Sequence, residues 1–143
     1  PDSDLVLSRQ HRIVIESAVC ELMIGTSRAF VPAGHLPAGI ASSPDPEEDV
    51  VYFHILLETH EILLANGLPA ESFQPARRMI ETLSVTSRKS LDDVLGVLGA
   101  ESMLARPDAL PTLKQREARV VLAALGRPTS LHPAEPQAGA TFN

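Results

Sequence analysis

The sequence predicts an α+β protein in which a mainly β first half is followed by a helical segment. Up to residue 73 the apolar residues come in short runs rich in Val, Ile and Leu, separated by Gly, Pro and Asn, which is typical of strands joined by turns. After Pro75 they recur at helical spacing between capping signals, and the last stretch is Pro-rich without periodicity. We therefore predict a β-rich portion over residues 1–73, a helical extension over 74–126 and a disordered tail over 127–143.

The composition limits the class of protein. With 143 residues, 44% of them hydrophobic, the chain is long enough to bury one true core. Its net charge of -6 argues against a nucleic-acid partner, because phosphate-binding surfaces carry a basic excess. No apolar run reaches the roughly 20 residues that span a bilayer. Cys20 is the only cysteine, which excludes an internal disulfide and a cysteine-based zinc site.

Short apolar runs mark the strands of the first part. We predict β runs over residues 5–7 and 12–15, with a polar quartet between them whose side chains can converge on a pocket. Two further apolar runs, over residues 18–24 and 29–31, end at a Gly and a Pro. Residues 32–46 are dense in Pro and Gly and end in an acidic stretch, so we expect a solvated loop there.

The central stretch over residues 50–73 is the part around which the rest is organised. Residues 50–57 and 62–64 are rich in β-branched and large apolar residues, so we predict two strands. Asn66-Gly67 supplies the positive φ angles of a tight hairpin turn, after which we expect a short strand.

We predict three helices beyond residue 73. Each prediction rests on a residue that favours a helix start, followed by apolar residues at helical spacing. The expected helices are residues 76–83 after Pro75, a helix opened by Ser90 with Asp93 and stopped by Gly99, and a helix opened by Thr112 with Gln115 that runs to Leu125 before Gly126.

The histidines are the candidates for catalysis or metal binding. His60-Glu61 begins a zinc-protease HExxH pattern, but Leu64 stands where the second ligand must be. His54 and His60 are too widely spaced along one strand for a shared metal. We therefore expect no metal site, and a histidine-based metal enzyme is the weakest of our alternatives. The sequence contains no Gly-rich phosphate loop and no Gly-x-Ser-x-Gly elbow, so serine hydrolase chemistry has no support.

Ser8 and His11 are the pair with chemical interest. Neutral imidazole donates from one ring nitrogen and accepts at the other, and a hydroxyl three residues away can share its pocket. On composition alone, a hydrogen-bonded turn and a surface imidazole explain the pair more simply. The same simple reading holds for His60 taken alone.

Two motifs in order point to a known family. Residues 5–15, LVLSRQHRIVI, resemble the Thr-x-x-His block of the Hedgehog/intein (Hint) autoprocessing domains, with Ser8 in the Thr position and His11 in the His position. Residues 50–67, VVYFHILLETHEILLANG, resemble the later block of these domains, with matching positions at Tyr52, His60, Asn66 and Gly67. The resemblance covers residues 5–83 and is closest to the bacterial Hint-like branch of long secreted or cell-surface proteins. It implies the C-terminal portion of a Hint-like horseshoe.

The resemblance also implies a mechanism. In Hint domains a first Cys or Ser attacks the preceding carbonyl and converts the peptide bond to a thioester or ester. By analogy, His11 protonates the departing nitrogen, Ser8 helps to hold that geometry and His60 assists from the later block. Phe53 stands where inteins commonly place an Asp, so His54 becomes a candidate for the missing acid-base role. No cofactor is implied.

This sequence departs from the family pattern in ways that bear on its activity. The expected nucleophile would lie upstream of Pro1, so we expect the chain alone to be inert and its partner to be its own upstream polypeptide. Cys20 lies in an apolar run and is expected to be a buried, small hydrophobe rather than a substitute. The His-Asn pair that ends an intein is absent after Gly67, so we do not expect splicing by Asn cyclisation. The alternative is a non-catalytic remnant that serves as an interaction or anchoring domain of a larger surface protein.

Overall fold

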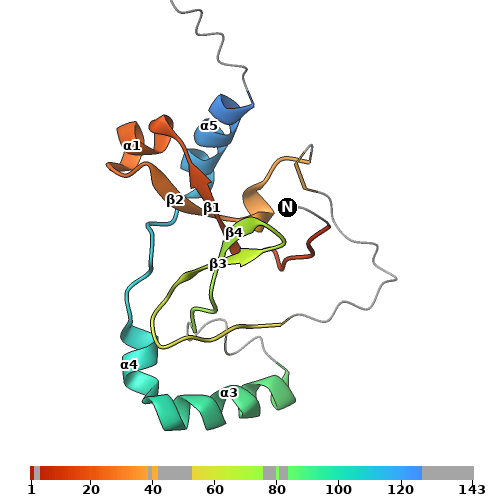
Figure 1. Ribbon diagram of the computed structural model, residues 1–143, viewed down its shortest axis with the longest axis vertical. Helices are drawn as coiled ribbons and strands as arrows, with labels where there is room; N and C mark the ends of the chain where they lie inside the picture. Colours follow the sequence, from red (N-terminus) through yellow and green to blue (C-terminus); the bar gives the residue numbers. More distant parts are fainter. Residues whose placement is uncertain (2–3, 39, 42–52, 76–79, 81–83, 127–143) are drawn as a thin grey trace, which may run out of the picture.

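The fold is α+β, as predicted, with a four-stranded antiparallel sheet between two groups of helices (Figure 1). The computed structural model describes residues 1, 4–38, 40–41, 53–75, 80 and 84–126. The strands are β1 (Arg12–Glu16), β2 (Arg28–Pro32), β3 (Ile62–Ala65) and β4 (Leu68–Glu71). The helices are α1 (Ala18–Ile24), the 3-10 helix η1 (Ala33–His35), α3 (Val85–Leu98), α4 (Ala100–Ala105) and α5 (Gln115–Leu125).

The sheet has the order β2-β1-β4-β3, so its two middle strands come from the two segments in which we predicted the site. Ile13 pairs with Val31 of β2 on one side and with Ala70 of β4 on the other. The predicted hairpin turn is confirmed, because Asn66 and Gly67 join β3 to β4 with φ angles of 48° and 76°. The sheet therefore places the start of β1 beside the end of β4.

Two of the predicted strands are wrong in the residues that the structure describes. Residues 5–7 and 53–57 have no regular strand pairing. The second of these segments is held by other contacts: Ile55 accepts a backbone hydrogen bond from Phe73 at 2.7 Å, and Leu56 packs against a helical core. Apolar, β-branched composition alone does not make a strand when no sheet neighbour is available. The run over residues 18–24, which we had left without a secondary structure, is helix α1.

The helix ends were predicted better than the helix starts. Helix α3 stops at Gly99, which has a φ of 86°, but it begins near Ser84, whose side chain accepts from the backbone N–H of Ser87. Helix α5 runs to Leu125 as predicted, and its first turn is capped by Glu117, which accepts from Lys114 N–H at 2.7 Å. Helix α4 was not predicted. The expected helix over residues 76–83 and the tail over 127–143 lie outside the described residues, apart from residue 80.

Two hydrophobic cores stabilise the two groups of helices. The first lies between α1, β2 and α5, and the second joins α3 and α4 to the segment around Phe73 (Figure 1). The first core contains Cys20, Ala29, Val31, Leu113, Ala118, Val121 and Leu122. The second contains Phe73, Leu91, Leu95 and Met103. Helix α5 thus shares a core with the β-rich portion rather than packing only with the other helices of the extension.

Two Gly-to-Ala variants test the backbone assignments. Gly67→Ala should lower the free energy of unfolding by about 1–2 kcal/mol, because a Cβ disfavours the left-handed φ of 76°. Gly96→Ala should raise it by about 0.5–1 kcal/mol, because Gly96 lies inside α3 and an added Cβ would meet no atom within 4 Å. Urea denaturation measures both. Equal effects of the two variants would contradict the assigned turn.

Candidate active site

Ser8 and His11 form a tight turn immediately before β1. The backbone N–H of His11 donates to the Ser8 carbonyl at 3.0 Å and approaches Ser8 Oγ at 3.3 Å. Helix η1 holds this turn from the other side, since Ala33 N–H donates to the His11 carbonyl at 2.8 Å. Gly34 comes so close that an added Cβ would lie 3.0 Å from the Arg9 carbonyl oxygen. The position of His11 is therefore fixed by its backbone, and its imidazole has no hydrogen bond to a residue that the structure describes.

His54 lies within electrostatic reach of His11. Burial lowers the pKa of His11, and the nearby charges of His54 and Arg12 lower this pKa further. Burial likewise lowers the pKa of His54, whose ring packs on Phe73 with 4.6 Å between the ring centroids. Both imidazoles are therefore neutral at pH 7, the form in which imidazole can accept a proton.

His60 lies in a different environment, fully inside the protein. Its side chain is 0% exposed, and its ring packs on Phe30 with 5.3 Å between centroids. Nδ1 accepts a hydrogen bond from the backbone N–H of Ala109 at 3.0 Å, and Nε2 lies 3.3 Å from Glu71 Oε2. In the described part of the chain, none of its hydrogen bonds or ring contacts involves Ser8, His11 or His54. The charge of His54 thus reaches His11, whereas His60 makes a separate set of contacts.

The hydrogen bonds of His60 define its protonation state. Because a backbone N–H can only donate, Nδ1 carries the lone pair and the ring hydrogen is on Nε2, facing Glu71. The 3.4 Å approach of Nδ1 to Asp108 is consequently a contact between two acceptors and not an ion pair. Burial is the largest influence and lowers the pKa of His60; the charge of Arg12 acts in the same direction. His60 is a neutral, buried imidazole.

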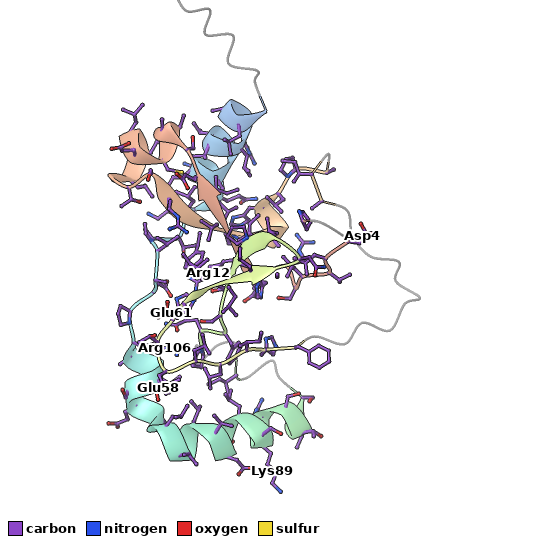
Figure 2. The ribbon with its side chains drawn as sticks, in the orientation of Figure 1. Asp4, Arg12, Glu58, Glu61, Lys89 and Arg106 are labelled. Carbon is purple, nitrogen blue, oxygen red and sulfur yellow. The ribbon has the colours of Figure 1, made fainter. Side chains whose placement is uncertain are left out.

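Arg12, labelled in Figure 2, links the sheet to the segment after α4. We name Arg12, Glu71 and Asp108 the ion cluster. Its Nε donates to Glu71 Oε2 at 2.6 Å, and its backbone N–H donates to Glu71 Oε1 at 2.7 Å. Its two terminal nitrogens donate to the two Asp108 oxygens at 2.8 and 3.1 Å, and Nη1 also donates to Thr112 Oγ1 at 2.7 Å. The guanidinium lies 5.0 Å from the centre of the Phe30 ring. One residue therefore connects β1, β4 and residues 108–112.

Charge and burial oppose each other throughout the ion cluster. Burial lowers the pKa of Arg12, but the Asp108 and Glu71 contacts outweigh it and the net change is upward. Burial raises the pKa of Glu71 against the influence of Arg12, whereas Arg12 holds the pKa of Asp108 below its usual range despite burial. Sequence reasoning did not select these residues. The available signal was weak: a charged residue at an end of each of two otherwise apolar strands.

The other expectations concern Cys20, Tyr52, a metal site and a membrane span. Cys20 is fully buried as predicted, and burial raises the pKa of its thiol. Tyr52 lies outside the described residues. Within the described ranges, no group of three or more His, Cys, Asp or Glu side chains is arranged to hold a metal ion. None of the helices in this part of the chain is long and apolar enough to cross a membrane.

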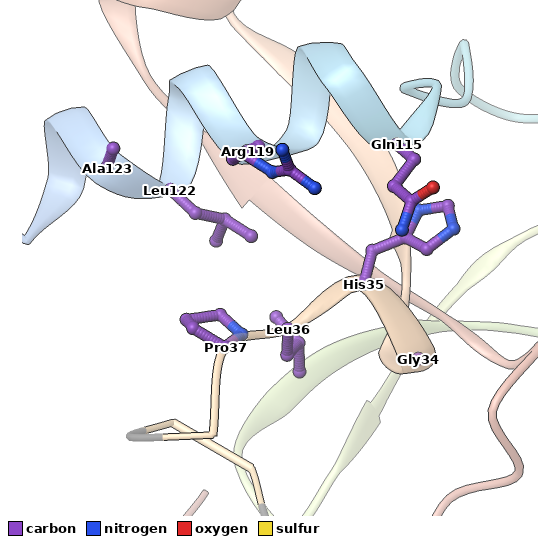
Figure 3. A pocket seen from close by; sticks show the side chains of 8 residues that line it. All are labelled: Gly34, His35, Leu36, Pro37, Gln115, Arg119, Leu122 and Ala123. Atoms are coloured by element: carbon purple, nitrogen blue, oxygen red, sulfur yellow. The ribbon is translucent and has the colours of Figure 1, made fainter.

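A pocket is lined in part by Gly34, the residue that closely approaches Arg9 (Figure 3). It has a volume of about 370 Å³ and lies between η1 and α5. Its lining combines apolar side chains with three polar ones: Gly34, His35, Leu36, Pro37, Gln115, Arg119, Leu122 and Ala123. Nδ1 of His35 is buried and has no hydrogen-bond partner among the described residues. Neither His11 nor His54 lines this pocket, so the candidate site and the pocket are separate.

Comparison with known proteins identifies the family. Residues 1–77 match the family model of the Hint domain. The match covers more than half of the 143 residues and includes the Ser8–His11 turn, the hairpin and the whole sheet. The chain therefore belongs to the Hint domain family, whose fold is of the autoprocessing type. Comparisons with curated proteins and with solved structures give no match.

The lowered pKa values predict a fall in stability with mild acid. For His11, His54 and His60 the pKa in the folded state lies below the ordinary 6.5. Their contribution to stability is therefore complete above pH 6.5 and is lost as the pH falls through their folded-state pKa values. The free energy of unfolding should decline by about 1.4 kcal/mol per pH unit for each proton taken up. The raised pKa of Glu71 makes the free energy of unfolding rise, not fall, as the pH is lowered. The contribution of Asp108 to stability is lost only below pH 3.8, so neither group causes this decline.

Urea denaturation at pH 7, 6 and 5 measures the effect. His60→Gln, which keeps an acceptor for Ala109 N–H but cannot be protonated in this range, should make the decline shallower than in the wild type. His132→Gln serves as the matched control and should leave the slope unchanged. The same slope for His60→Gln and wild type would contradict a buried neutral His60.

Proposed function

We propose that this chain is the C-terminal part of a self-processing Hint domain that rearranges an upstream peptide bond to a thioester or ester and then cleaves it. The observation that carries the proposal is the Ser8–His11 turn, which backbone hydrogen bonds fix within the Hint match; the charge of His54, from the later family block, reaches His11. Family membership supports the reaction type, because the fold is that of autoprocessing domains. The Ser8–His11 turn supports the role of His11, because its backbone is fixed and its imidazole makes no hydrogen bond to the residues that the structure describes.

The proposed first step is an N-to-S or N-to-O acyl shift. The thiol or hydroxyl of an upstream Cys or Ser adds to the carbonyl carbon before it, and the carbon–nitrogen bond breaks. The nucleophile loses its proton to neutral His54, the candidate base; His11 takes up that proton from the His54 imidazolium and delivers it to the departing nitrogen, so both rings end neutral. The net change is a peptide bond and a thiol converted to a thioester and a free amine, with no proton gained or lost.

The proposed second step is hydrolysis. Water attacks the thioester or ester carbonyl, the upstream segment leaves as a carboxylic acid and the sulfur or oxygen regains its proton. This step needs no Asn cyclisation, and the chain lacks the His-Asn pair that such a reaction uses after Gly67. The substrate is the protein's own upstream polypeptide, and no cofactor takes part.

The proposed role of His60 is indirect, because His60 does not touch the reacting atoms. Its ring faces Glu71, and Glu71 in turn accepts the backbone N–H of Arg12, the residue that follows His11. We propose that His60 assists by keeping this carboxylate in place. The same buried arrangement supports the second candidate function, a non-catalytic remnant, since a folded remnant would retain it for stability alone.

A cleavage assay on a precursor that carries the native upstream sequence distinguishes the two functions. His11→Ala should slow cleavage by about two to four powers of ten, because proton transfer by a positioned side chain contributes that much. Adding dithiothreitol should accelerate release of the upstream fragment if a thioester accumulates. Gel electrophoresis and mass spectrometry follow the products over time.

His132→Ala is the matched control, because we assign this histidine no role, and it should cleave at the wild-type rate. The thermal melt of each variant should stay cooperative, which separates lost chemistry from lost folding. Cleavage of His11→Ala at the wild-type rate would overturn the proposal, and a precursor that is never cleaved would favour the remnant.

A further inference from the structure

Residues 106–112, the first part of the segment between α4 and α5, lie beyond the family match, which ends at residue 77. We name these residues the linker. It nevertheless makes direct hydrogen bonds to the segments that carry every predicted site histidine. Its contacts divide into two groups, one made by Arg106 and one made by Asp108, Ala109 and Thr112.

Arg106 binds both segments that surround His54 (Figure 2). Its guanidinium donates to the backbone carbonyls of Leu57 and Phe73 and, through Nε, to Gln74 Oε1 at 2.6 Å. Gln74 returns a hydrogen bond to the Arg106 carbonyl at 3.0 Å. Three acceptors in different directions match the rigid fork of a guanidinium, which a lysine ammonium does not reproduce.

These hydrogen bonds fix the place of His54. The segment over residues 53–57 has no strand pairing, so isolated contacts rather than a ladder hold it beside residue 73. Phe73 donates its N–H to Ile55 at 2.7 Å and packs its ring on His54, and Arg106 joins the two segments just beyond that point. All the acceptors are neutral, so the charge of Arg106 serves geometry and not an ion pair.

The second group of contacts acts on the other two histidines. Asp108 binds both terminal nitrogens of Arg12, the residue after His11, and Thr112 binds one of them. Ala109 donates its backbone N–H to His60 Nδ1 at 3.0 Å. The linker therefore touches the surroundings of His11, His54 and His60 at the same time.

We infer that the linker is part of the autoprocessing machinery, with Arg106 as the positioning residue for His54 and Asp108 as the positioning residue for the His11 turn. This inference rests on the proposed function and extends it to a segment that the family match does not include. Arg106 touches no reacting atom. It acts by joining the segment that carries His54 to the segment of Phe73, on whose ring His54 packs.

The test uses Arg106→Gln and Arg106→Lys in the full precursor, with Arg116→Gln as the matched control. Arg116 is an exposed arginine of α5 that lines neither the site nor the pocket. Both Arg106 variants should cleave at least tenfold more slowly, since lysine keeps the charge but not the fork, and their pH–rate profiles should shift. Arg116→Gln should match the wild type in rate and profile.

Histidine titration by NMR on the 143-residue chain supplies a readout that does not depend on cleavage. In the Arg106 variants the pKa of His54 should move up toward 6.5 and that of His11 should follow, because burial and their mutual repulsion are both reduced. Asp108→Asn should alter the titration of His11 and His60 while leaving His54 close to its wild-type value.

The outcomes separate the two proposals. If the wild-type precursor is never cleaved but the His54 titration moves in Arg106→Gln, the proposed function fails and the positioning role stands. If the wild type is cleaved, His11→Ala is inactive and both Arg106 variants match the wild type in rate and titration, the positioning role is overturned. If an Arg106 variant lacks a cooperative melt, Gln74→Leu replaces it, because this change removes only one acceptor of Arg106. An unchanged His54 titration in Gln74→Leu would likewise count against the inference.

Discussion

The ion cluster around Arg12 is the interaction on which the rest of the structure depends. A guanidinium that is only 14% exposed needs partners for its charge and its donors, and it finds them in Glu71 of β4 and Asp108 of the linker. The three residues lie far apart in sequence, so the cluster closes the whole fold around the start of β1. Removing one partner would leave a charge without compensation inside the protein, which is far more costly than losing an exposed ion pair.

The ion cluster also explains why the histidines differ. His60 is kept neutral by burial and by the charge of Arg12, while its Nδ1 accepts from Ala109 and its Nε2 lies 3.3 Å from Glu71 Oε2. His11 differs, since its backbone is hydrogen bonded while its ring has no hydrogen bond to a described residue. One imidazole thus belongs to the residue before Arg12, in the candidate turn, and the other lies in the interior beside the Arg12 partners.

The amount that the sequence could predict depends on whether a feature is local. The Asn66-Gly67 turn, the stop at Gly99 and the burial of Cys20 follow from local chemistry, and the structure confirms all three. The β run over residues 50–57 failed within its described part because a strand needs a partner, which local composition does not supply.

The candidate site divides in the same way. His11 and His54 could be proposed from two motifs, since each motif is contiguous in the sequence. The ion cluster of Arg12, Glu71 and Asp108 could not be proposed in this way, because it forms through contacts between residues 59 and 96 positions apart in the sequence. Arg106 could not be predicted either, since two of its three acceptors are backbone carbonyls that carry no sequence signal.

The pairing of Phe30 with the end of the linker has a consequence for the order of events during synthesis. Phe30 accepts from Leu113 N–H and donates to Pro111, both at 2.8 Å, so the outer side of β2 gains its neighbour from a segment made some 80 residues later. Until the ribosome has passed that segment, β2 is an open edge and the surroundings of His54 and His60 are incomplete. A reaction that depends on these surroundings would therefore not occur on the shorter nascent chain and would begin only after translation has passed Leu113.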